Sequence, residues 1–320
     1  MSKSSLNAFC NAIAEAHDHG CCFIPETKGQ SLYARRMARR GKLIIPLKGM
    51  YALPEVWSDL DKLEQHAFKC RSLALKHPYW VFCHASAASL YGLYISHADL
   101  REVHVACCKG SYSRSSDQIR RHYLADIDEH EHEGMPVTSV LQTAYDCMRS
   151  MSFQQGLAVA DSVLRFYGYT REDLVSYIER HRNLRGHAGA LEAANHADGA
   201  SESGGESIAR ARMIELGFEV PKLQVELDDP LDLGREYRAD FLWELDDGTE
   251  LIGELDGHEK YTNVKMTEGR DIVEVLIDER NRESRVSAYK GRRVMRFSYA
   301  EMMNSSFFEL LLDTYGVPRA

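Results

Sequence analysis

The sequence predicts a multidomain α+β protein built from three parts. Its 320 residues exceed the roughly 250 at which a single hydrophobic core stops growing. Apolar residues make up 44% and charged residues 27% of the chain, the balance of a globular protein. The stretch from Asn195 to Gly205 is rich in Gly, Ser, Ala and Asp and predicts a flexible linker or an exposed loop. The expected domains are therefore residues 1–58, 59–195 and 196–320.

The first domain is expected to be a winged helix-turn-helix. Apolar side chains at helical spacing predict a helix over residues 6–19. A second helix is expected over residues 31–40, since Gly41 is a common helix stop. Residues 42–53 then predict two short strands that turn near Gly49. Helix, basic helix and hairpin, in this order, make a winged helix-turn-helix.

The second helix and the hairpin are basic, although the formal net charge of the chain is -9. No Asp or Glu lies between Thr27 and Pro54. A helix in the major groove brings arginines to phosphates and guanine edges, and a wing contacts the neighbouring backbone. The alternative is a solvated basic helix without a partner. The candidate DNA-binding residues are Lys28, Arg35, Arg36, Arg39, Arg40, Lys42 and Lys48.

The second domain is expected to be a mixed α+β domain whose chemistry the sequence leaves open. Helices are predicted over residues 60–76, 85–91, 139–149 and 153–167, and strands over residues 102–107 and 118–123. His130 and His132 alternate among five carboxylates and could bind a metal, but a polar surface strand is favoured. Cys83 and His84 are not expected to form a nucleophile and base, because neighbouring residues on a strand point to opposite faces.

The cysteines and the hydropathy of the chain indicate a cytoplasmic protein. The eight cysteines include no CxxC pair, so zinc is not expected and the thiols are interpreted as structural. No segment has the roughly 18 consecutive apolar residues of a membrane span, and the N-terminus lacks the features of a signal peptide. A membrane partner is therefore not expected.

The third domain is expected to begin with a helix and continue as a sheet that carries acidic residues. Ser203 followed by Glu206 matches a capping box, and the helix is expected to stop at Gly217. Strands are predicted over residues 220–227, 237–245 and 250–256, the last two joined by an Asp-Gly hairpin turn.

Three acids on the last two strands are candidate metal ligands. Glu254 and Asp256 share one strand face by the period of two, and Asp240 lies on the preceding strand. Converging carboxylates suit Mg²⁺ or Mn²⁺, which could activate a water for attack on a phosphodiester. The alternative is an exposed acidic sheet face, with Asp240 paired to Arg238 or Arg270.

This C-terminal pattern resembles the very-short-patch-repair-like branch of the PD-(D/E)XK nuclease superfamily over about residues 200–305. The matching pieces are residues 206–210, 238–243, 253–257, 279–280 and 294–299. The resemblance implies a restriction-endonuclease-like α/β domain, with a mixed sheet flanked by helices and a divalent metal at Asp240 and Glu254.

The chain departs from the superfamily at Asp256, where many members have Lys. The resemblance allows Asp256 to act as a further ligand, and Lys260 or His258 could supply the positive or proton-transferring group. With Glu206, these residues complete the candidate catalytic set.

The first 185 residues are similar to the N-terminal part of AbiEi-type antitoxins, which are bacterial winged-helix regulators. The matching pieces are residues 39–43, 49–53, 84–92 and 136–139, the last of these followed by Thr143 and Asp146. The first hypothesis is accordingly a DNA endonuclease or nickase targeted by its winged helix. The second is an antitoxin-like repressor whose nuclease-like domain is inactive and serves homodimerisation or binding of a cognate toxin.

Overall fold

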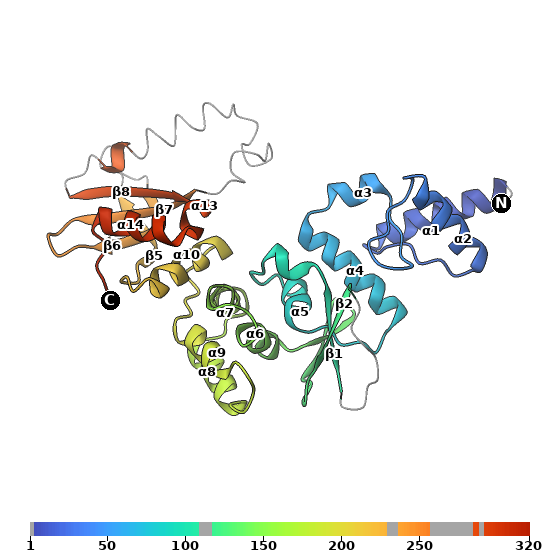
Figure 1. Cartoon of the computed structure of the whole chain (residues 1–320), viewed down its shortest axis with the longest axis horizontal. Coiled ribbons are helices and arrows are strands. Elements are labelled where there is room, and N and C mark those ends of the chain that lie inside the picture. Colours follow the sequence, from blue (N-terminus) through green and yellow to red (C-terminus); the bar gives the residue numbers. More distant parts are fainter. Residues whose placement is uncertain (1–2, 109–116, 229–235, 257–283, 288–290) are drawn as a thin grey trace. The chain divides into compact units, whose positions relative to one another are not determined.

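The computed structural model describes residues 3–108, 117–228, 236–256, 284–287 and 291–320 (Figure 1). The chain is a mixed α/β protein with two compact units, of which unit 1 is residues 1–151 with 176–190 and unit 2 is residues 152–175 with 191–320. Among the described residues, no helix is both long and apolar enough to cross a bilayer. Five residues named above lie outside the described ranges. They are Lys260, His258, Arg270, Glu279 and Arg280.

Unit 1 begins with two helices, α1 (Lys3–Asp18) and α2 (Lys28–Arg39). They enclose a small core of Phe9, Ile13, Phe23, Ala34, Leu43 and Tyr51. Helix α2 starts three residues earlier than expected because Thr27 caps it. The Thr27 hydroxyl accepts from the backbone N–H of Gln30, and the Gln30 side chain accepts from the N–H of Thr27.

The predicted hairpin is reduced to isolated bridges. Ile44 pairs with Ala52 and Phe23 with Tyr51, both antiparallel, and residues 42–53 contain no regular strand. Pro46 has no N–H to give to a ladder, and its carbonyl instead accepts from the Gln118 side chain. The expectation of two strands is therefore wrong in this segment, which is followed by α3 (Pro54–Asp59).

The rest of unit 1 contains, among its described residues, two two-stranded sheets together with helices. Its elements are α4 (Lys62–Lys76), α5 (His84–Leu90), η1 (His97–Leu100), β1 (Val103–Cys107), β2 (Ile119–Tyr123), β3 (Glu129–His132), β4 (Met135–Thr138) and α6 (Val140–Met148). Strands β1 and β2 are parallel, and β3 and β4 antiparallel. Phe82 bridges Val105 of β1 and Val137 of β4, and all three side chains are fully buried. Strand β3 is mostly exposed, as expected for a polar surface strand.

Unit 2 is a mixed four-stranded sheet with helices. Its elements are α7 (Phe153–Tyr167), α10 (Gly204–Glu215), β5 (Lys222–Asp228), β6 (Glu236–Glu244), β7 (Glu250–Asp256), β8 (Arg292–Ser298), α13 (Tyr299–Met303) and α14 (Ser305–Tyr315), while α8 (Arg171–Arg180) and α9 (His187–Asn195) cross the boundary between the units. The strand order is β5-β6-β7-β8, and only the β7–β8 pair is parallel. Met213, Phe241, Phe297 and Phe308 join α10 and α14 to one face of this sheet.

The stretch from 195 to 205 is not an exposed linker. The buried Arg210 of α10 donates to the backbone carbonyl of His196 at 2.6 Å and to both carboxylate oxygens of Asp161 in α7 at 2.7 Å. The N–H of Asp198 donates to Asp161 as well. A Cβ on Gly199 would lie 3.1 Å from the Cβ of Leu164. Small residues occur here because the chain packs closely on α7, which explains why α7 belongs to unit 2.

Candidate functional site

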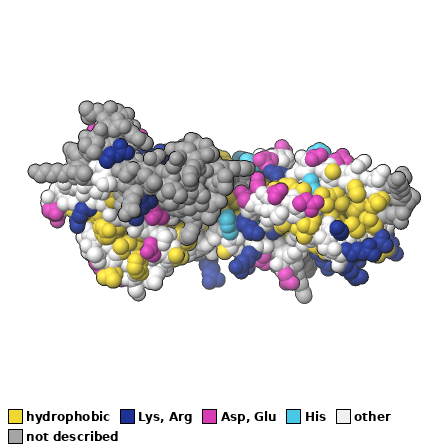
Figure 2. Space-filling view, turned by 90° about the horizontal axis from the view of Figure 1, so that it is seen from above, with side chains coloured by type: hydrophobic (Ala, Val, Ile, Leu, Met, Phe, Trp, Pro, Cys, Tyr) yellow, Lys and Arg dark blue, Asp and Glu magenta, His cyan; other side chains and the backbone are white. Residues whose placement is uncertain are grey.

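The seven predicted DNA-binding residues are all exposed. Ala34 is the buried side chain of α2, and arginines four residues apart, at 35 and 39 and at 36 and 40, form two rows on the exposed side. None of the seven forms an ion pair with another residue in the described ranges. Figure 2 shows Lys and Arg side chains gathered at the right-hand end, where Figure 1 places α1 and α2. We call these seven residues the basic surface.

In unit 2, the predicted acids Glu206 and Asp240 lie close together. The Gln224 amide donates to Glu206 Oε2 at 2.9 Å and to Asp240 Oδ1 at 3.4 Å. Burial raises the pKa of Glu206, and the nearby Asp240 charge raises it further. Glu206 also accepts from the hydroxyl of Ser203 and the N–H of Glu202. Ser203 caps α10 by accepting from the N–H of Glu206, whereas the Glu206 carboxylate accepts from the N–H of Glu202 and not from that of Ser203, so the predicted capping box forms only in part.

Asp240 occupies the point where regular pairing between β6 and β7 ends. The last paired residues are Phe241 and Gly253, and beyond them the Asp240 carboxylate accepts from the N–H of Leu255 at 3.1 Å. A Cβ on residue 253 would lie 3.0 Å from the Trp243 ring. Glycine at this position therefore lets the backbone of β7 lie close to the Trp243 side chain. The side chain of Asp240 thus takes the place of a ladder carbonyl.

Glu254 and Asp256 are engaged by other side chains. The Tyr237 hydroxyl donates to Glu254 Oε1 at 2.6 Å. The Arg296 guanidinium from β8 forms an ion pair with Asp256. Among the described residues, Asp240, Glu254 and Asp256 do not bring three ligand atoms within 4.8 Å of one another. A divalent ion shared by these acids would require their side chains to move closer.

A group in unit 1 does meet that distance. One ligand atom each from Cys83, His84 and His122 lies within 4.8 Å of the other two, so these residues could hold a metal ion. Cys83 and His84 were expected to point to opposite faces of a strand. They do not, because His84 has φ +49° and is the first residue of α5. The expectation that zinc is unlikely rested on the absence of CxxC, which says nothing of a ligand from a distant strand. No sequence signal indicated that His122 joins the pair.

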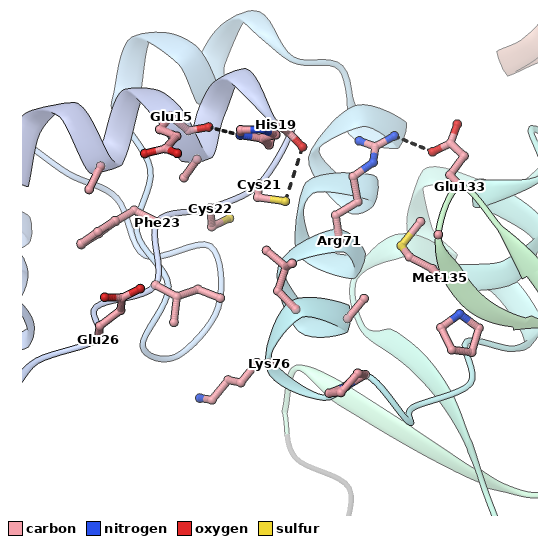
Figure 3. Close-up of a pocket in the computed structure, with 18 of the residues that line it drawn as sticks. Glu15, His19, Cys21, Cys22, Phe23, Glu26, Arg71, Lys76, Glu133 and Met135 are labelled. Carbon is pink, nitrogen blue, oxygen red and sulfur yellow. Dashed lines mark hydrogen bonds and ion pairs between the residues drawn. The ribbon is translucent and has the colours of Figure 1, made fainter.

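A pocket of unit 1, of about 1070 Å³, is lined by residues of α1, α4 and the β3–β4 turn (Figure 3). An ion pair between Arg71 and Glu133 at 2.9 Å lies on one side of it. Cys21 and Cys22 lie in the wall of the pocket. Burial raises the pKa of both thiols, and it raises that of Cys22 to about 11. These cysteines are therefore protonated at neutral pH and poor nucleophiles.

Comparison with known proteins gives relatives but no function. No protein-family model matches the chain. Uncharacterized proteins from two strains of Mycobacterium tuberculosis are each 29% identical to it over 163 residues. The match covers 51% of this chain and 58% of each relative.

Proposed function

We propose that the chain is a DNA-binding protein that uses the basic surface as its contact. The observation that carries the proposal is that all seven cations of an acid-free segment are exposed and unpaired with described acids. Cations left free in this way can release counterions from a phosphate backbone, which is the main source of affinity for DNA. The proposal implies action in the cytoplasm, where bacterial DNA lies.

We further propose that unit 2 is a Mg²⁺- or Mn²⁺-dependent phosphodiesterase of the endonuclease or nickase type. Two observations support this activity. Glu206 and Asp240 are held together by one amide, and Glu254 and Asp256 lie on the adjacent strand of a mixed sheet. Oxygen-only donors prefer hard cations. Burial raises the pKa of Glu206 and the Asp240 charge adds to it, and a cation between the two acids would offset that repulsion. Lys260 remains a candidate for the positive group.

A repressor without nuclease activity is the second candidate. The ion pair between Asp256 and Arg296 favours it, because a carboxylate neutralised by Arg is a weak metal ligand. In this case the nuclease-like domain would serve dimerisation or contact with a toxin. DNA binding by the basic surface is common to both candidates, so cleavage is what separates them.

DNA binding is tested with a variant in which Arg35, Arg36, Arg39 and Arg40 are all changed to Ala. Each lost phosphate contact lowers the slope of log K against log salt by about 0.9 on duplex DNA. We expect a slope smaller by about 3 to 4 and an affinity reduced at least about 100-fold at low salt, measured by fluorescence anisotropy.

The control for charge removes four exposed cations elsewhere in unit 1, with Lys62, Lys76, Arg101 and Arg182 changed to Ala. It should bind DNA nearly as wild type does. Equal losses in the two variants would mean that total charge matters and the basic surface does not, which would contradict the proposed contact.

Cleavage is tested on supercoiled plasmid and on single-stranded and mismatched DNA, with Mg²⁺ or Mn²⁺. Asp240→Ala should lower the rate of nicking by about 100-fold or more, while Asp246→Ala, at the exposed tip of the hairpin, should not. Absence of metal-dependent cleavage by wild type on all of these substrates would leave the repressor as the remaining candidate.

A further inference from the structure

The cluster of Cys83, His84 and His122 shares no residue with the basic surface or with the candidate acids of unit 2. Cys83 precedes α5, His84 is its first residue, and His122 comes from β2. Cys83 has no exposed surface, and His84 retains 3% of its own. The proposed DNA-binding and phosphodiesterase activities use none of these side chains.

The backbone of His84 is strained in a way that brings the donors together. Its φ of +49° lies in the left-handed region, which is unfavourable for an L-residue with a side chain. Such strain persists where the surrounding structure requires it, and it is concentrated at functional sites. Here it allows two consecutive side chains to converge on His122, which alternating strand geometry would not.

Two polar atoms beside the cluster have no hydrogen-bond partner. They are His84 Nδ1 and Asp146 Oδ2, buried and 4.0 Å apart, a separation too long for a hydrogen bond. The other oxygen of Asp146 is taken by the Arg149 guanidinium at 2.7 Å. Buried polar atoms are nearly always satisfied, so an unpartnered pair at one spot calls for a missing participant.

A third histidine contacts the cluster. His104 Nδ1 lies 3.0 Å from His122 Nε2, so a hydrogen bond between them controls which nitrogen of His122 carries the proton.

We propose that Cys83, His84 and His122 bind one borderline-soft divalent ion of the zinc class. Thiolate and imidazole donors select zinc over magnesium. Binding would release the proton of the Cys83 thiol to solvent and leave the sulfur as a thiolate ligand. Asp146 would accept a hydrogen bond from the ring of His84 and so orient it, as carboxylates commonly do beside metal-bound histidines.

Binding requires a modest contraction of the cluster. The present ligand atoms lie within 4.8 Å of one another. Zinc bonds of about 2.0–2.3 Å separate tetrahedral ligand atoms by about 3.3–3.8 Å, so the contraction is at most about 1.5 Å. The rings of His84 and His122 are stacked at 3.6 Å between centroids, and they must splay to share an ion. We expect this change to lengthen the contact between His122 and His104.

The test is a titration of the full chain, stripped with a chelator under reducing conditions, with Co²⁺ and then Zn²⁺. Co²⁺ should give one equivalent of tetrahedral d–d absorption together with a thiolate charge-transfer band, and Zn²⁺ should displace both. Cys83→Ala should abolish the charge-transfer band, His122→Ala should weaken binding at least 100-fold, and Asp146→Asn should weaken it about 10–100-fold.

Matched controls are Cys10→Ser and His97→Ala, which alter an exposed cysteine and an exposed histidine away from the cluster. Both should titrate as wild type does. Thermal unfolding in the absence of metal shows which variants are folded, and Mg²⁺ should neither bind at the site nor raise the Tm.

Wild-type protein that gives no thiolate band with Co²⁺ would overturn the proposal, whatever the variants do. A band that survives Cys83→Ala, or one lost equally in Cys10→Ser, would also overturn it. Because the readout is metal binding, it is independent of DNA binding and cleavage.

Discussion

The two units differ in the polar groups that they bury, among which are histidines in unit 1 and an Arg–Asp ion pair in unit 2. Unit 1 buries imidazoles in their neutral form, and His66 is the clearest case, since its ring lies between the carbonyl of Leu100 and the hydroxyl of Ser86. Unit 2 buries a full ion pair, in which Arg210 grips both oxygens of Asp161. A neutral ring can take up a proton or a metal, whereas loss of one member of an ion pair leaves the other charge buried without its partner. The difference indicates that unit 1 should be sensitive to solution chemistry and unit 2 to the loss of a partner.

The candidate metal ligands divide along the same line. Those of unit 1 are sulfur and nitrogen atoms in a closed cluster, and those of unit 2 are carboxylate oxygens. By donor type, the first should discriminate against Mg²⁺ and the second should accept it. We therefore expect a zinc-class ion in unit 1 and Mg²⁺ or Mn²⁺ in unit 2.

The largest expected effect is in unit 2. Asp161→Ala leaves the Arg210 guanidinium buried without its carboxylate, which should cost about 3–5 kcal/mol of the free energy of unfolding. Urea unfolding followed by the fluorescence of Trp243, the tryptophan of unit 2, measures it. Asp161→Asn, which keeps an acceptor, should lose less. A loss below about 1 kcal/mol in the Ala variant would remove the contrast between the units, given the cost expected for an uncompensated buried charge.

The next effect is an acid sensitivity of unit 1. Burial lowers the pKa of His66 to about 4, so between pH 6.5 and about 4 the unfolded chain binds a proton that the folded chain does not. Stability is therefore complete above pH 6.5 and falls as the pH drops through this window. At about 1.4 kcal/mol per pH unit, His66 alone would contribute a loss of up to about 3 kcal/mol.

His66→Gln should flatten this dependence, whatever its effect at neutral pH. Unfolding free energies measured from pH 7 to pH 4 by the fluorescence of Trp57 and Trp80, both in unit 1, provide the comparison. Parallel curves for the variant and wild type would show that His66 is not the group responsible.

The smallest effect concerns the acids of unit 2. Gln224→Leu removes the amide that donates to Glu206 and Asp240, and we expect a loss of about 1 kcal/mol at neutral pH because other donors to Glu206 remain. Gln154→Leu, which removes an exposed hydrogen bond to Glu215, is the control and should change stability less. If Gln224→Leu proves neutral, the two acids do not depend on this amide.

Local patterns predicted most of the elements. The range 153–167 expected for α7 equals the observed helix, and the strand over 250–256 was also predicted at its observed bounds. Periodicity and turn residues suffice there because these segments follow their intrinsic preferences. The predicted hairpin was wrong because Pro46 has no N–H to donate to a ladder. The predicted linker was wrong because small residues allow close packing as well as flexibility.

The candidate sites depended on information that the sequence does not carry locally. The shared strand of Glu254 and Asp256 follows from alternation, but the pairing of Asp256 with Arg296 requires the parallel register of β7 and β8. The left-handed backbone of His84 has no signature, since the residue is not glycine. His122 lies 38 positions after His84 in the sequence, and only the folded chain brings their side chains together.

The clasp of Arg210 on α7 also affects how the chain can be divided. A protease that favours exposed, Gly- and Ser-rich segments should find residues 195–205 a poor substrate, because their backbone is held by Arg210 and Asp161. A fragment beginning at residue 196 would lack Asp161 and expose the surface that α7 covers. A fragment beginning at residue 152 would retain the ion pair, and we expect this longer fragment to stay folded.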